Sequence, residues 1–126
     1  ASEDQEHRAL IKWARYKRLY LVHIPNEGKR SIVNGSRLKA LGMQKGFPDL
    51  LLAQPTARYH GLFIELKRTK NSSPSPEQKW WLEHLESKGY KAVVARGFEA
   101  AKVIIEEYLT IENKTDDEDM IIDPLP

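Results

Sequence analysis

Residues 62–66 constrain the fold more than any other part of the sequence. They read Leu-Phe-Ile-Glu-Leu, so in the strand that such a run predicts, apolar side chains point to both faces. A strand that is apolar on both faces has to be covered on both, which favours a sheet between layers of helices. Glu65 is the exception in this run, and a carboxylate there is costly unless its charge is compensated.

The remaining patterns predict an α/β fold, a mixed β-sheet flanked by helices. The expected order is helix 3–18, strand 19–24, helix 31–43, strand 47–53, strand 62–66, a helix from a Ser75 N-cap with Pro76 and Gln78 in its first turn to Gly89, strand 90–95 and helix 98–109. Strands 47–53 and 62–66 are expected to pair as an antiparallel hairpin. In the second helix Ile32, Leu38 and Leu41 are expected to face inward, although Gly35 weakens that helix.

Charge is distributed unevenly along the 126 residues. Residues 1–111 carry 19 Lys or Arg and 12 Asp or Glu, a net of +7, whereas residues 112–126 carry one Lys and six acids, a net of −5. We expect residues 1–111 to form one domain and residues 112–126 a flexible acidic tail. A basic body suits a polyanion such as nucleic acid, although a generally solvated basic surface would carry the same charge.

The chain has no cysteine, which excludes disulfides and thiolate chemistry. Any metal would therefore sit on oxygen or histidine ligands. The histidines show no metal-ligand spacing, so the sequence does not favour zinc; they are His7, His23, His60 and His84. No apolar run is long enough to span a bilayer and no signal peptide opens the chain, so we expect a cytoplasmic protein without a membrane partner.

The combination of Pro48-Asp49 with Glu65-x-Lys67 indicates catalytic chemistry. Glu65 and Lys67 share one face of their strand, and Asp49 opens the neighbouring strand, where its carboxylate can approach Glu65. Converging carboxylates repel, and a hard divalent cation removes that penalty. Taken singly, a Pro-Asp pair is commonly a turn and Glu-x-Lys is commonly a solvated face. Their occurrence together around a buried strand favours a metal site with Lys67 beside it, suited to phosphodiester hydrolysis.

The order of these motifs resembles the virus-type replication-repair nuclease (VRR-NUC) branch of the PD-(D/E)xK nuclease superfamily. The resemblance covers about residues 2–109, and the matching segments are 2–6 with Trp13, 24–30, 46–50, 59–67, and 75–78 with 81–82. It implies a restriction-endonuclease-like fold. It also implies that Asp49, Glu65 and the backbone carbonyl of Leu66 ligate Mg²⁺ or Mn²⁺, and that Lys67 is the catalytic lysine.

The resemblance implies two further site residues. An acid of the first helix completes such sites, and here it is Glu3 or Glu6; Glu3 is favoured because the pattern Glu-x-x-x-(Gln/His) then ends at His7. Gln78 is the family's further polar site residue, although its capping role alone would account for it. Four cations flank the site and are expected to contact phosphates, the alternative being mere solvation: Lys29, Arg30, Arg68 and Lys70.

These features together predict a metal-dependent DNA endonuclease. Small standalone domains of this kind resemble structure-selective nucleases that act as homodimers on branched DNA such as four-way (Holliday) junctions, in a bacterial or phage-infected cell. Of the neighbouring Trp80 and Trp81, one indole is expected to stay exposed, at a dimer interface or a core edge. The alternatives are a non-catalytic DNA-binding module on the same fold, and a nonspecific or sequence-specific DNA endonuclease.

Overall fold

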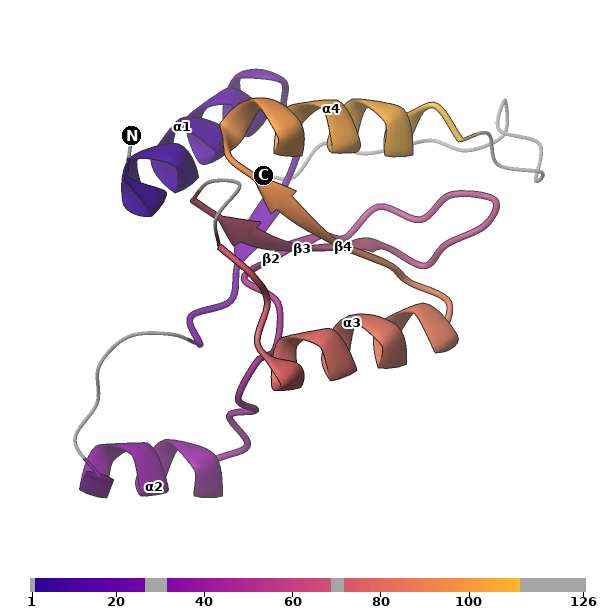
Figure 1. Ribbon diagram of the computed structural model, residues 1–126. Coiled ribbons are helices and arrows are strands. Elements are labelled where there is room, and N and C mark those ends of the chain that lie inside the picture. Colours follow the sequence, from indigo (N-terminus) through magenta and orange to yellow (C-terminus); the bar gives the residue numbers. More distant parts are fainter. Residues whose placement is uncertain (1, 27–31, 69–71, 112–126) are drawn as a thin grey trace.

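The order of helices and strands predicted from the sequence is confirmed. The structure is a computed structural model that describes residues 2–26, 32–68 and 72–111 (Figure 1). Its elements are α1 (Glu3–Tyr16), β1 (Leu21–His23), α2 (Ile32–Ala40), β2 (Leu50–Leu52), β3 (Leu62–Lys67), α3 (Pro76–Ser87), β4 (Lys91–Arg96) and α4 (Phe98–Leu109). No described helix is long and apolar enough to cross a membrane.

The sheet is mixed, with the strand order β1-β2-β3-β4. β2 and β3 form the expected antiparallel hairpin, in which Leu50 pairs with Ile64 and Leu52 with Leu62. β4 runs parallel to β3, because α3 carries the chain back across one face of the sheet before β4 begins. The first five residues of β3 are buried, as the apolar run predicted.

Helices cover the two faces of the sheet in different ways. α1 and α4 lie on one side and α3 on the other (Figure 1). On the first face, Leu10 of α1 and Ile105 of α4 join Ile64 in a buried cluster. On the second face, Leu85 of α3 packs with Phe63. Because successive strand residues alternate between faces, Glu65 and Lys67 belong to the α3 side with Phe63.

Capping explains where two helices begin. Ser2 and Gln5 form a reciprocal capping box at the start of α1, and Ser75 and Gln78 form another at the start of α3, where Pro76 occupies the first turn. The predicted ends are less accurate. α1 stops at Tyr16, two residues early, and β1 and β2 have three residues each because only that part of each segment pairs in the sheet.

The prediction for α2 was wrong in one respect. Leu41, which was expected to face inward, is 69% exposed just after the helix ends, and α2 lies apart from the sheet in Figure 1. The physical reason is that residues 34–37, Asn-Gly-Ser-Arg, interrupt the apolar positions, so α2 has no continuous apolar stripe with which to pack. The side chain of Ile32 lies outside the described part of the chain.

Candidate active site

The hairpin register brings Asp49 opposite Glu65. Leu50 pairs with Ile64, so the next position outward on each strand places these two carboxylates on the same face. Side chains directly opposite each other across an antiparallel pair have Cβ atoms roughly 5 Å apart. Both are buried, with Asp49 3% exposed and Glu65 1% exposed. The structure thus brings together the two carboxylates that the sequence analysis singled out.

Backbone hydrogen bonds hold Asp49 on both sides. Its Oδ2 accepts a hydrogen bond from the Leu66 amide at 2.9 Å, and its backbone carbonyl accepts one from the Ile24 amide at 2.6 Å. The N–H and C=O of one strand residue point to the same side of the strand. The Leu66 carbonyl is therefore directed to the side of β3 on which Asp49 lies, in line with its predicted role as a ligand.

Glu65 contacts Gln78 and Lys67. The Gln78 Nε2 atom donates a hydrogen bond to Glu65 Oε2 at 3.0 Å, and Lys67 Nζ lies 3.5 Å from the same oxygen. Gln78 Oε1 meanwhile accepts a hydrogen bond from the Ser75 amide in the capping box. The two interpretations of Gln78 are therefore compatible, because one end of the amide caps α3 and the other reaches the site.

The charge and chemistry of this group fit a hard divalent cation. Asp49 and Glu65 contribute two buried negative charges, and Lys67, whose side chain is 14% exposed, contributes one positive charge. Two carboxylates and a strand carbonyl are the oxygen ligands that Mg²⁺ and Mn²⁺ prefer, and Mg²⁺ usually keeps several waters as its other ligands. Within the described residues, no three Asp, Glu or His side chains are gathered closely enough to hold an ion without such waters.

Of the two candidate acids of α1, Glu6 has a partner outside this group. Glu6 Oε1 accepts a hydrogen bond from the Phe98 amide at 3.2 Å, at the start of α4, where Gly97 provides no side-chain cap. A carboxylate at a helix N-terminus is favourable, so Glu6 has a structural role that the sequence did not reveal. Glu3 lies one turn earlier and is partly buried. Arg68, at the end of β3, is exposed, whereas Lys29, Arg30 and Lys70 lie outside the described residues.

Gly46 allows the start of α3 to pack closely against the segment that leads to Asp49. Its φ is +86°, and a Cβ added there would lie 2.7 Å from the backbone carbon of Glu77 and 2.8 Å from the amide nitrogen of Gln78. No side chain fits so close to a backbone, and a positive φ disfavours one further. Gly46 therefore sets the distance between the two segments that carry Asp49 and Gln78.

Comparison with known proteins gave consistent matches. The family model described as the VRR-NUC domain matches residues 1–99. A solved structure described as "VRR_NUC domain protein" is 29% identical, with a TM-score of 0.80 over 90% of this chain and 92% of that chain. Another, described as "VRR_NUC domain", is 24% identical and shares the fold, with a TM-score of 0.54 over 86% of this chain and 99% of that chain. No curated protein matches the chain.

The role of Gly46 in the packing of α3 can be tested by comparing alanine substitutions at two glycines, Gly46 and Gly42. Gly42 also has a positive φ, +105°, but nothing lies within 4 Å of a Cβ added there. Both Gly→Ala changes force an unfavourable φ, and only Gly46→Ala adds the clash with α3. We expect Gly46→Ala to lower the free energy of unfolding by about 1–3 kcal/mol more than Gly42→Ala, measured by urea denaturation. Equal losses in the free energy of unfolding for the two variants would contradict this role of Gly46 in the packing of α3.

Proposed function

The chain belongs to the VRR-NUC family, and from this premise we propose that it is a metal-dependent DNA endonuclease whose active site comprises Asp49, Glu65 and Lys67. Membership places the chain in a nuclease superfamily. The observation that carries the proposal is the pair of buried carboxylates, Asp49 directly before β2 and Glu65 opposite it on β3, with Lys67 Nζ 3.5 Å from Glu65. A protein that only bound DNA would gain nothing from two buried acids facing phosphate.

Each residue of the site has a distinct role in this proposal. Asp49, Glu65 and the Leu66 carbonyl hold Mg²⁺ or Mn²⁺, which when bound supplies Lewis-acid polarisation of the phosphodiester. Lys67 donates hydrogen bonds from its ammonium to the attacking water or to the phosphate oxygens, where negative charge develops. Gln78 is a positioning residue, because its amide holds Glu65 Oε2 at 3.0 Å.

Glu3 is the acid of α1 that we assign to the site, ahead of Glu6. The hydrogen bond from Phe98 supports this choice, because the Glu6 carboxylate caps α4. Glu3 lies in the first turn of α1 and is partly buried. It would act through water, since the described residues hold no group of three acids or histidines close enough to share an ion.

The substrate we propose is branched DNA, in particular the four-way junction, cut by a homodimer in the cytoplasm of a bacterial or phage-infected cell. A junction is symmetric and needs two cuts, and a two-fold dimer places two identical sites on it. The exposed indole of Trp80, 55% accessible and stacked on His84, supplies apolar surface for an interface between subunits. Arg68, Lys29, Arg30 and Lys70 are the proposed phosphate contacts.

Substitution of Glu65 tests the active site. Glu65→Ala removes a proposed metal ligand, so we expect it to abolish cutting of a labelled four-way junction in Mg²⁺ or Mn²⁺. Binding of the same junction in EDTA should be unchanged or tighter, because one negative charge near phosphate is lost. Glu83→Ala, which removes an exposed acid of α3, is the control and should cut normally. Undiminished cleavage by Glu65→Ala would refute the assignment of the site.

The two acids of α1 should separate activity from stability. Glu3→Gln is expected to slow cleavage far more than Glu6→Gln, as measured by single-turnover kinetics. Glu6→Gln should instead lower the free energy of unfolding, by roughly 0.5–2 kcal/mol, because the N-terminus of α4 loses a charged acceptor. If the ranking of the cleavage rates is reversed, Glu6 is the site residue and our assignment is wrong.

The proposed homodimer is tested by the mass of the protein in solution. Light scattering at micromolar concentration should give about twice the chain mass of 14.5 kDa. Trp80→Ser should weaken that association without changing the fold, since the indole is largely exposed. A protein that remains monomeric under these conditions and still cuts junctions would contradict the dimer.

A further inference from the structure

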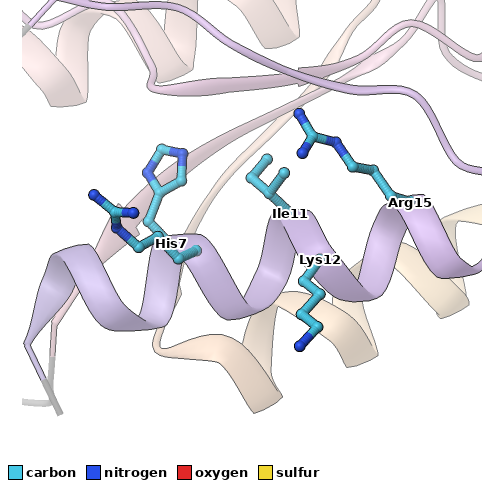
Figure 2. A pocket seen from close by; sticks show the side chains of 5 residues that line it. His7, Ile11, Lys12 and Arg15 are labelled. Carbon is cyan, nitrogen blue, oxygen red and sulfur yellow. The ribbon is translucent and has the colours of Figure 1, made fainter.

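α1 carries a basic hollow that the proposed active site does not use. Its first turn is acidic, whereas the side chains that follow line a surface hollow of about 410 Å³ (Figure 2). The lining residues are His7, Arg8, Ile11, Lys12 and Arg15. Figure 2 shows His7, Ile11 and Arg15 projecting to one side of the helix and Lys12 extending the other way. Three of these five side chains carry a positive charge at neutral pH.

The positive charges of the hollow are available to an external anion. Among the described residues, neither Lys12 nor Arg15 lies within ion-pair distance of a carboxylate. Arg8 pairs with Asp4 at 2.9 Å, but both side chains are more than three-quarters exposed, so the pair contributes little stability and is readily exchanged. The helix dipole favours a cation near the C-terminus of a helix, which accounts in part for Arg15. It does not account for Lys12, which lies in the middle of the helix.

The hollow adjoins β1, the strand that pairs with β2. The His7 ring packs edge-on against His23 of β1, with ring centroids 4.6 Å apart. His23 pairs with Leu50, the residue directly after Asp49. From Arg8 to Arg15 the helix rises about 10 Å, which corresponds to roughly three base steps along one DNA strand.

We propose that this hollow binds the sugar-phosphate backbone of the DNA arm that leaves the active site, with Lys12 and Arg15 as phosphate contacts. The inference rests on the proposed function and adds the path of the substrate, which runs over α1. Contacts of this kind hold the arm in position and read no sequence, so they should act equally on unrelated sequences. Ile11, which projects to the same side of the helix as Arg15, provides apolar surface against which the sugars can pack.

The test is the salt dependence of DNA binding by the double variant Lys12→Gln/Arg15→Gln. Each phosphate contact contributes about 0.9 to the slope of log K against log salt, so the slope should fall by roughly 2, and affinity at 0.1 M salt by on the order of 60-fold. The matched control is Arg58→Gln/Lys88→Gln, which removes two exposed cations at the opposite end of β3. This control variant should keep the wild-type slope of log K against log salt. The probe is a fluorescein-labelled four-way junction in EDTA, where no cutting occurs.

The outcomes separate this inference from the proposed function. Equal slopes for the two double variants, with the wild-type protein still cutting junctions, would overturn the basic hollow and leave the nuclease intact. If the slope of log K against log salt falls only for the α1 variant, and the wild-type protein never cuts DNA, the inferred DNA contact of the hollow is supported and the proposed nuclease activity is refuted. Thermal melting checks that both variants are folded, which is expected because all four side chains are exposed.

Discussion

The burial of Glu65 in the middle of the sheet is the constraint on which the rest of the structure depends. A carboxylate that is 1% exposed has lost most of its hydration, and such a loss costs several kcal/mol unless neighbouring groups compensate it. Here the compensation comes from two groups: Lys67 lies two residues along the same strand, and Gln78 reaches Glu65 from α3. Asp49 adds a second buried carboxylate, whose charge repels that of Glu65 unless a cation offsets both.

The topology of the sheet brings these residues close to Glu65. The antiparallel hairpin sets Asp49 against Glu65, and the parallel return of β4 requires α3 to cross the face on which both carboxylates lie. The capping box then orients Gln78, whose two ends serve the helix and the site at once. Gly46 completes the arrangement, since only a residue without a Cβ allows its segment to approach the first turn of α3 so closely. Stability and the proposed chemistry thus share the same few contacts.

Local patterns in the sequence predicted most of the fold and singled out the residues of the proposed site. Three predictions were confirmed: the burial of β3 on both faces, the β2–β3 hairpin and the capping box at Ser75. Each of them depends on residues that are close in sequence. Assigning Asp49, Glu65 and Lys67 to a site needed only the spacing of residues on paired strands. The exposure of Leu41 was missed, because the prediction did not test whether the apolar residues of the second helix fall on one continuous face.

Long-range contacts were not predictable in the same way. Glu6 caps α4 from 92 residues away, and no local pattern distinguishes that role from a role in the proposed metal site. The cations Arg8, Lys12 and Arg15 are evident in the sequence, but only the structure shows that they line one hollow, whose His7 contacts β1. The clash that makes Gly46 necessary likewise involves α3, which lies some thirty residues further along the chain.

The central claim is that Asp49 and Glu65 form a site for a divalent cation, and thermal unfolding with and without Mn²⁺ tests it without DNA. A cation that binds only the folded state raises the melting temperature as its concentration rises. We expect the wild-type Tm to rise with Mn²⁺. The Asp49→Asn variant, which keeps an oxygen to accept the Leu66 amide but removes one buried charge, should melt at or above the wild-type Tm in EDTA and should not respond to Mn²⁺. An equal Mn²⁺ response in the two proteins, or a wild-type protein that does not respond, would contradict the account.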